Sequence, residues 1–192
     1  LGPWQRPDGA LYFPMEPAET FNVLMMVRSP DGGATWSEID GKHRPETGDL
    51  EGFATAWHEG VIYMLHQISE ATYLHAFDTS EGLGAWTLRD ELVSEHTEPP
   101  TQVAALVAHP DGRLTALFGD SLSLIARTRA SKGTVSSTST GPVSGPAPAP
   151  GSASWSEERR FDTQPGWIDS GVMATRAPDG RIHIAYTSSL PA

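Results

Sequence analysis

The sequence predicts an all-β protein in which the chain forms about three to three and a half four-stranded blades of a β-propeller. Three observations predict this fold. An acidic residue followed by glycine recurs about every 50 residues, each time before a run rich in β-branched and aromatic residues. Tryptophans recur with nearly the same spacing. The 19 glycines and 16 prolines among 192 residues interrupt the chain too often for long helices.

The acidic-glycine pairs mark the expected hairpins, because Asp-Gly readily supplies the positive φ angles of a two-residue loop. The pairs are Asp8-Gly9, Glu59-Gly60, Asp111-Gly112 and Asp179-Gly180. A strand-like run follows each pair, at residues 10–13, 61–65, 113–118 and 181–186. Another run precedes the last three pairs, at residues 53–57, 103–108 and 172–176. No clear first strand precedes the first pair.

The tryptophan series consists of Trp36, Trp86 and Trp155, at intervals of 50 and 69 residues. The acidic-glycine pairs are spaced by 51, 52 and 68 residues, so the last interval is longer in both series. One insertion explains both differences, and residues 131–154 match it because they are rich in Ser, Thr, Gly, Pro and Ala and contain no aromatic residue. Such a segment buries too little apolar surface to offset its ordering entropy, so we expect a surface loop without core or site residues.

These repeats predict one partial propeller with blades at about 1–45, 50–95, 101–163 and 169–192. In the second blade we expect strands at Phe53–Trp57, Val61–His66, Tyr73–Phe77 and Trp86–Leu88. Counting all repeats gives 13 strands. Because an open array leaves sheet faces and strand edges exposed, we expect a second copy of the chain, or sequence absent from it, to complete a ring. The alternative is an open all-β monomer that is not a propeller.

Charge and composition exclude several classes of function. The net charge of −11 repels phosphate backbones and anionic headgroups, so neither nucleic acid nor a membrane is an expected partner. The absence of cysteine removes disulfides, thiolate metal sites and cysteine nucleophiles. His58, His66 and His75 cluster in the second repeat, where a metal pair is conceivable, but solvated hairpin histidines are the alternative. Since no third ligand is placed by the pattern, we predict no metal and no cofactor.

Residues 29–36 carry the most specific motif in the chain. They match the pattern S-x-D-x-G-x-T-W at every defined position, through Ser29, Asp31, Gly33, Thr35 and Trp36. Asp31 can accept hydrogen bonds from its own loop, Gly33 tolerates positive φ, and Trp36 can pack into the blade. Residues 80–86 and 151–155 are degenerate copies. The motif is therefore a structural device.

With these residues the chain resembles the Asp-box (BNR) repeat proteins of the sialidase superfamily. The resemblance implies a sialidase-like propeller, mostly six-bladed in that superfamily, with the box between the third and fourth strands of a blade. It also implies a ligand funnel on the opposite face, and a function in binding or hydrolysing glycans. The expected partner is thus a glycan or another small molecule.

Acidic residues are abundant in the loops that the resemblance assigns to the funnel. Paired carboxylates carry out glycoside hydrolysis, and aromatic side chains stack on sugar faces. The candidate catalytic residues are Glu19, Glu16, Asp49 and Glu51, and the candidate substrate-binding residues are Arg44, Trp167, Asp169 and Glu98. The same loops hold Glu70, Glu95 and Asp120. The alternative is that these carboxylates are only the solvated side chains of an acidic protein.

A sialidase needs more than these carboxylates. The resemblance would require three arginines around the substrate carboxylate, an aspartate acid/base and a tyrosine nucleophile supported by glutamate. Of the eleven arginines in the chain, Arg44 alone falls in a predicted funnel loop. We therefore do not expect sialidase activity from this chain alone. Two hypotheses remain: a glycan-active domain, catalytic or only binding, and a non-catalytic propeller scaffold or protein-interaction domain.

Overall fold

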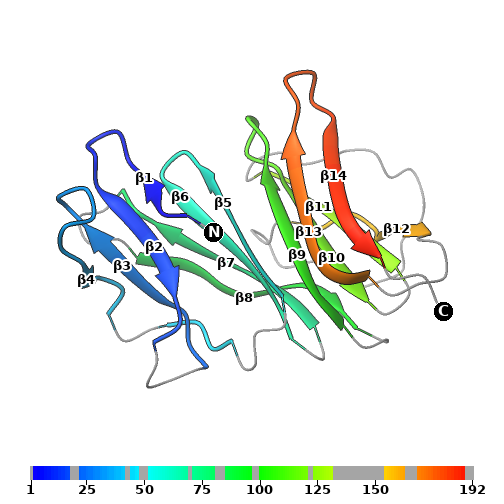
Figure 1. The fold of residues 1–192 in the computed structure, drawn as a ribbon, viewed down its shortest axis with the longest axis horizontal. Helices are drawn as coiled ribbons and strands as arrows, with labels where there is room; N and C mark the ends of the chain where they lie inside the picture. The colour runs from blue at the N-terminus through cyan, green and yellow to red at the C-terminus, as the bar shows by residue number, and fades with distance from the viewer. Residues whose placement is uncertain are drawn as a thin grey trace.

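The computed structural model describes residues 2–17, 22–41, 44–47, 52–68, 71–80, 85–96, 100–120, 123–131, 154–162 and 168–188. Within these ranges the protein is all-β, with 14 strands in four antiparallel sheets and no helix (Figure 1). It follows that the described part of the chain contains no helix able to span a membrane.

Each sheet comes from one continuous stretch of chain, and its strands lie in sequence order. Sheet 1 contains β1 (Trp4–Gln5), β2 (Leu11–Met15), β3 (Met25–Ser29) and β4 (Ser37–Glu38). Sheet 2 contains β5 (Gly52–His58), β6 (Val61–Gln67), β7 (Ala71–Asp78) and β8 (Ala85–Glu95). Sheet 3 contains β9 (Pro100–Ala108), β10 (Leu114–Asp120), β11 (Ser123–Arg129) and β12 (Arg159–Asp162). Sheet 4 contains β13 (Ile168–Arg176) and β14 (Ile182–Ser188).

Two strands differ from the sequence prediction. The first repeat does have a first strand, since Trp4 and Gln5 pair with Tyr12 and Leu11. The predicted count of 13 strands is therefore wrong, because a two-residue strand is too short to show an alternating pattern. The fourth strand of sheet 2 continues well beyond the predicted end at Leu88, because a bulge at Asp90, with a φ of 55°, lets the pairing with β7 resume.

The four acidic-glycine pairs form the predicted hairpin turns, but only Glu59-Gly60 is a two-residue loop with positive φ at both positions, 46° and 86°. In the other three turns only the glycine has positive φ. There the glycine N–H donates to the carbonyl three residues earlier, as from Gly9 to Arg6 at 2.9 Å. The aspartate side chain accepts the amide two residues later, as Asp8 does from Ala10. The two-residue prediction is therefore wrong for these three, since the aspartate acts through its side chain rather than through positive φ.

The four sheets stack face to face in chain order, and an apolar layer fills each junction. The core between sheets 1 and 2 includes Tyr12, Met26, Ile62, Met64 and Phe77. The core between sheets 2 and 3 includes Leu65, Leu74, Leu106, Phe118 and Ile125. The core between sheets 3 and 4 includes Leu117, Leu124, Val172 and Ile184. Sheets 2 and 3, the two inner sheets, are therefore covered on both faces. This agrees with their sequences, because their strands carry apolar residues on both faces.

The first strands of the sheets are neighbours, since β5 packs against β9 and β9 packs against β13. Trp4 of β1 is joined to β5 by a hydrogen bond of 3.2 Å from its Nε1 to Thr55 Oγ1. The first and third strands of each sheet end, and its second and fourth strands begin, toward one end of the stack, here called the turn end, at the top of Figure 1. The opposite end, called the loop end, holds the last residues of the second and fourth strands and the first residues of the first and third strands.

Candidate functional site

The box at residues 29–36 lies at the turn end, between β3 and β4. Asp31 Oδ1 accepts hydrogen bonds from Ser29 Oγ at 2.7 Å and from the Thr35 amide at 2.9 Å, and its Oδ2 accepts from Thr35 Oγ1 at 2.7 Å. Ser29 Oγ in turn accepts the Gly33 amide at 2.7 Å. Gly33 has a φ of 101°, and its carbonyl accepts the Trp36 Nε1–H at 3.1 Å. Every defined residue of the motif thus takes part in one hydrogen-bonded turn.

The electrostatics of Asp31 agree with a structural role for this turn. The hydrogen bonds from Thr35, followed by that from Ser29, lower the pKa of Asp31 to about 2. The carboxylate is therefore ionised at any physiological pH, and it has no proton to give. The box organises a turn and leaves acid/base chemistry to other residues.

Of the four candidate catalytic residues, the structure describes Glu16. It follows β2 directly at the loop end, and its Oε1 accepts a hydrogen bond of 2.9 Å from Thr47 Oγ1. Thr47 is buried, so this bond ties the end of β2 to the connection that leaves sheet 1. Glu19, Asp49 and Glu51 lie outside the described residues.

Among the candidate substrate-binding residues, Arg44 lies at the loop end of sheet 1 in an ion-pair cluster. Its guanidinium approaches Glu38 at 2.6 Å and Asp40 at 3.1 Å. The buried Asp40 also accepts the Met26 amide at 2.8 Å. Arg44 therefore helps to fix the chain after β4. Glu98 and Trp167 lie outside the described residues, and for Asp169 only the backbone, within β13, is described.

The loop end of sheets 2 and 3 holds a polar cluster centred on Asp120. This carboxylate is buried at the end of β10, where Oδ2 accepts from Arg160 at 2.7 Å and Oδ1 accepts from the Ser123 amide at 2.7 Å. Arg160 also reaches Glu158 at 3.2 Å, and Ser94 of β8 donates to Glu158. The sequence places Asp120 in a funnel loop but gives no signal for its partner, because Arg160 lies 40 residues away.

Gln67 and His96 extend this polar cluster toward sheet 2. The Gln67 amide donates a hydrogen bond of 2.5 Å to the Gly119 carbonyl, while its buried Oε1 has no hydrogen-bond partner. His96 Nε2 lies 2.9 Å from Thr72 Oγ1, and burial lowers the pKa of His96. Asp120 and Gln67 are buried, whereas the Arg160 side chain is 42% exposed, so Arg160 is a member of this cluster that can donate hydrogen bonds to a sugar hydroxyl.

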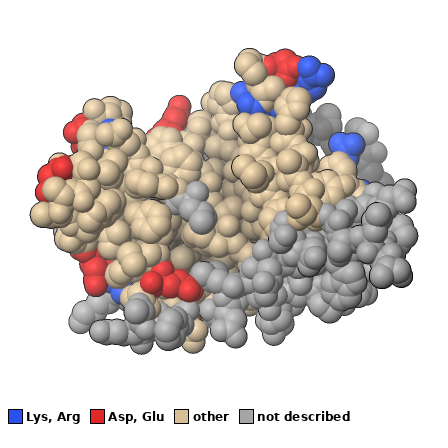
Figure 2. All heavy atoms as spheres, viewed as in Figure 1, with Lys and Arg blue, Asp and Glu red and all other residues tan. Residues whose placement is uncertain are grey.

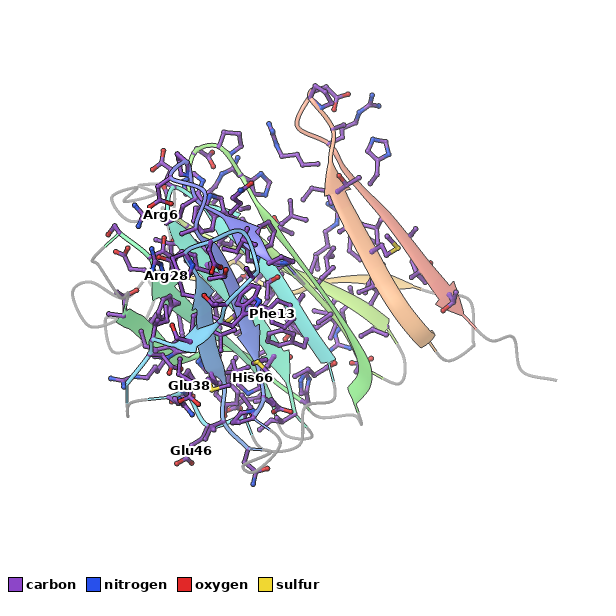
Figure 3. The ribbon with its side chains drawn as sticks, turned by 60° about the vertical axis from the view of Figure 1, so that its left-hand side comes forward. Arg6, Phe13, Arg28, Glu38, Glu46 and His66 are labelled. Atoms are coloured by element: carbon purple, nitrogen blue, oxygen red, sulfur yellow. The ribbon has the colours of Figure 1, made fainter. Side chains whose placement is uncertain are left out.

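His66 and His75 form a buried pair on the face of sheet 2 that packs against sheet 1, where Figure 3 labels His66. His75 Nε2 lies 2.6 Å from His66 Nδ1, and the Asp90 amide donates to His75 Nδ1 at 3.1 Å. The hydrogen bond from the Asp90 amide makes Nδ1 of His75 an acceptor. The ring proton of His75 is therefore on Nε2, which donates the hydrogen bond to Nδ1 of His66. Burial lowers the pKa of His66 to about 4 and, with the neighbouring His66, that of His75 to about 3.

This geometry replaces both sequence interpretations of these histidines. His66 and His75 are not solvated hairpin residues. The two ring nitrogens that would have to bind a shared metal are instead hydrogen-bonded to each other. Across the described ranges, no group of three His, Cys, Asp or Glu side chains is placed to hold a metal ion. The alternation of the strands could have indicated the burial, because His66 and His75 share a face with Met64 and Phe77.

Two surface grooves of about 450 Å³ each are lined by described residues. One runs along the neighbouring first strands and is lined by apolar or small residues, among them Phe53, Ala105, Gly171 and Met173. The other opens between sheets 3 and 4 and combines apolar residues with arginines. Neither groove contains a carboxylate pair of the kind that glycoside hydrolysis needs.

No protein-family model matches the chain, and no curated protein matches it in sequence. Its function is therefore inferred from its own residues and geometry.

Proposed function

We propose that this chain is part of a sialidase-like Asp-box propeller that binds or hydrolyses glycans at its loop end. The observation that carries the proposal is the complete hydrogen-bonded box, in which Asp31, Ser29 and Thr35 close the turn between the third and fourth strands of sheet 1. The stacking of four consecutive sheets with adjacent first strands supports it. The fold alone does not specify chemistry, so the loop end carries the functional part of the proposal.

The loop end offers two kinds of group for glycan recognition. Arg160, which is 42% exposed and is held by the buried Asp120, supplies a guanidinium near the junction of sheets 2 and 3. Glu16 supplies a carboxylate at the end of β2, within the same stretch of sequence as Glu19. In a hydrolase, one such carboxylate would protonate the leaving oxygen while a second acted as base or nucleophile.

The test is a panel of neutral and sialylated fluorogenic glycosides together with a glycan array. We expect hydrolysis or saturable binding of at least one glycan. Glu19→Gln and Glu16→Gln should each lower hydrolysis at least tenfold if these carboxylates act on the bond, since general acid–base catalysis contributes roughly 10²–10⁴-fold. The control is Glu157→Gln, which changes an exposed glutamate that follows Trp155. Silence on the whole panel and the array would contradict the proposal and favour a scaffold or protein-interaction domain.

We also propose that a further sheet, from a second copy or from sequence flanking this chain, covers the outer face of sheet 1. In sheets 2 and 3 the box tryptophan lies against the preceding sheet, and Trp86 and Trp155 donate to Asp40 and Glu91 there. Trp36 is 43% exposed and bonds only its own loop, and Met15 on the same face is also exposed. Light scattering tests whether a second copy of the chain supplies this sheet, because a dimer has about twice the mass of 20.6 kDa. A stable monomer with unchanged Trp36 exposure and no partner would refute ring completion.

A further inference from the structure

A bulge in the last strand of sheet 2 lies directly opposite His75. Two residues of β8, Arg89 and Asp90, face this single residue of β7. Asp90 has a φ of 55°, in the left-handed region that residues other than glycine seldom adopt, and its amide donates to His75 Nδ1 at 3.1 Å. The Asp90 carboxylate is 59% exposed, and its Oδ1 lies 3.9 Å from the same nitrogen. One residue therefore places both a donor and an acceptor beside one ring nitrogen.

The hydrogen bonds of the histidine pair fix the place of any additional proton. His75 Nδ1 accepts from Asp90, and His75 Nε2 donates to His66 Nδ1 across 2.6 Å. With one more proton, the bond between the rings survives only if His75 Nδ1 carries a proton. This holds whichever ring is charged, because His66 Nδ1 can donate to His75 Nε2 only after the His75 proton has moved to Nδ1. Nδ1 then becomes a donor and can no longer accept the Asp90 amide.

The surroundings of the pair favour a carboxylate as the new partner of Nδ1. Tyr73 stacks on His66 with 5.4 Å between the ring centroids. The charged and titratable groups that reach this junction from the other elements include Arg89 of β8, Glu46, Asp40 with its partner Arg44, and Tyr12 with its partner Arg28. Burial, together with Glu46, raises the pKa of Asp90, so its carboxylate gains from a cationic partner. Around sheets 1 and 2 most charged side chains visible in Figure 2 are acidic, which favours uptake of a proton.

Glu91 connects the bulge to the next junction. It follows Asp90 in β8 and opposes Leu74, on the face toward sheet 3. There it holds the Arg129 guanidinium at 2.6 and 2.8 Å and accepts the Trp155 indole N–H at 2.9 Å. A rotation of the backbone at Asp90 moves Glu91, and hydrogen bonds weaken steeply when their atoms are displaced. Two consecutive residues therefore couple the two faces of sheet 2.

We propose that the Asp90 bulge is an acid-operated switch. When the histidine pair takes up a proton from solvent, the Asp90 amide leaves His75 Nδ1 and the Asp90 carboxylate accepts the new N–H. The shifted backbone then releases Glu91 from Trp155. In mild acid sheets 2 and 3 are held less tightly at this junction, while each sheet keeps its own strand pairing. The switch lies apart from the groups proposed for glycans and goes beyond that function.

The test follows the folded protein by nuclear magnetic resonance from pH 7 to pH 4.5. The ring nitrogen shifts of His66 and His75 report protonation, and the Asp90 amide reports the bond that should be lost. Hydrogen exchange of the Trp155 indole reports the junction, and exchange of the Phe118 amide in the core reports global unfolding. We expect the two histidine and Asp90 signals to change with one midpoint. Trp155 should lose protection at least about tenfold relative to Phe118, as for the loss of one charge-assisted hydrogen bond.

Variants at Asp90 separate the switch from general acid sensitivity. Asp90→Asn keeps the amide donor and tolerates the left-handed backbone, but it lacks the charged acceptor. Its midpoint should fall by about one pH unit, because a neutral amide stabilises the imidazolium less than a carboxylate does. Asp90→Gly keeps the positive φ without any side-chain acceptor and should lower the midpoint at least as far.

The matched control is Glu59→Gln. Among the described residues Glu59 is the other non-glycine residue with positive φ, and its carboxylate lies 3.7 Å from His58. The midpoint of the buried pair should not move in this variant. Circular dichroism confirms that each variant is folded, and the glycine variant serves if the asparagine variant is not.

Three results would overturn the proposal. The first is that the Asp90 amide and the Trp155 indole keep their signals and protection down to pH 4.5, with or without ring protonation. The second is loss of Trp155 and Phe118 protection at the same pH, which would show that acid unfolds the whole protein and not one junction. The third is a common midpoint for the parent protein and both Asp90 variants, which would show that this carboxylate does not accept the new N–H.

Discussion

The indole Nε1–H of Trp155 donates a hydrogen bond of 2.9 Å to Oε1 of Glu91, and this bond joins sheet 3 to sheet 2. Glu91 also receives the guanidinium of Arg129 in a bidentate pair, at 2.6 and 2.8 Å. The junction between sheets 1 and 2 has a similar bond, from Trp86 to Asp40 at 3.3 Å. Trp86 and Trp155 thus act as donors that link their sheets to a carboxylate of the preceding sheet, whereas Trp36 donates within its own loop.

The Glu91 junction should be critical for stability. We expect Glu91→Gln to lower the free energy of unfolding by about 3 kcal/mol, because the largely buried Arg129 would lose its counter-charge. Urea unfolding followed by tryptophan fluorescence measures the change. The control, Glu157→Gln at an exposed position, should stay within about 0.5 kcal/mol of the parent protein. A similar effect for both variants would contradict a special role for Glu91.

The buried histidine pair should make the protein less stable in mild acid. The pKa values of His66 and His75 in the folded protein, about 4 and about 3, lie below the ordinary value of about 6.5 that they regain on unfolding. The unfolded chain therefore binds more protons below pH 6.5. Each histidine then lowers the free energy of unfolding by up to about 1.4 kcal/mol per pH unit, until the folded pKa is reached.

Urea unfolding at pH 7, 6 and 5 measures this slope. The double change His66→Gln and His75→Gln should flatten it, whatever its effect at pH 7. His183→Gln, at an exposed histidine of β14, is the control for the loss of a histidine outside the buried pair. If the double variant loses stability between pH 7 and pH 5 as steeply as the parent protein, the pair does not titrate as described.

The box turn should depend on Asp31. Asp31→Asn removes the charged acceptor of the Thr35 amide and hydroxyl, so the amides of Gly33 and Thr35 should exchange with solvent faster. The pKa of Asp31 in the folded protein is about 2. Its contribution to the free energy of unfolding is therefore present above the ordinary aspartate pKa and is lost as the pH falls through about 2. Ser29→Ala is the matched variant: it removes the acceptor of the Gly33 amide and should accelerate exchange there more than at Thr35. Unchanged exchange in both variants would refute this account.

The segment from Lys132 to Gly151 should be dispensable. On its two sides the chain is already joined, since Ala130 donates to the Ser154 carbonyl at 3.1 Å and Ser156 donates to the Thr128 carbonyl at 2.8 Å. Deleting 132–151 therefore leaves two paired strands that a short turn can connect. Thermal and urea unfolding should show a loss below about 1 kcal/mol. A Gly/Ser segment of equal length is the control. A larger loss that the deletion and this control share would show that the native residues pack against the sheets, whereas a loss on deletion alone would show that the connection needs its length.

The sequence predicts those features of the fold that depend on neighbouring residues. Asp179-Gly180 and its flanking apolar runs are sufficient for a hairpin, because turn chemistry and strand alternation are local. The box at Ser29 to Trp36 is equally local, since all its bonds are made within eight consecutive residues. The two-residue strand at Trp4 has no such signal, because only its pairing with Leu11 and Tyr12 of β2 defines it.

The tertiary structure decides which distant side chains meet. Trp155 and Glu91 are 64 residues apart, and only the packing of sheet 3 on sheet 2 brings the indole to the carboxylate. The same stacking buries His75 and leaves Trp36 exposed, although Trp36 and Trp86 occupy similar places in their repeats. A local pattern fixes which face of a strand a residue lies on, whereas the neighbouring sheet determines whether that face is buried and which charge it meets.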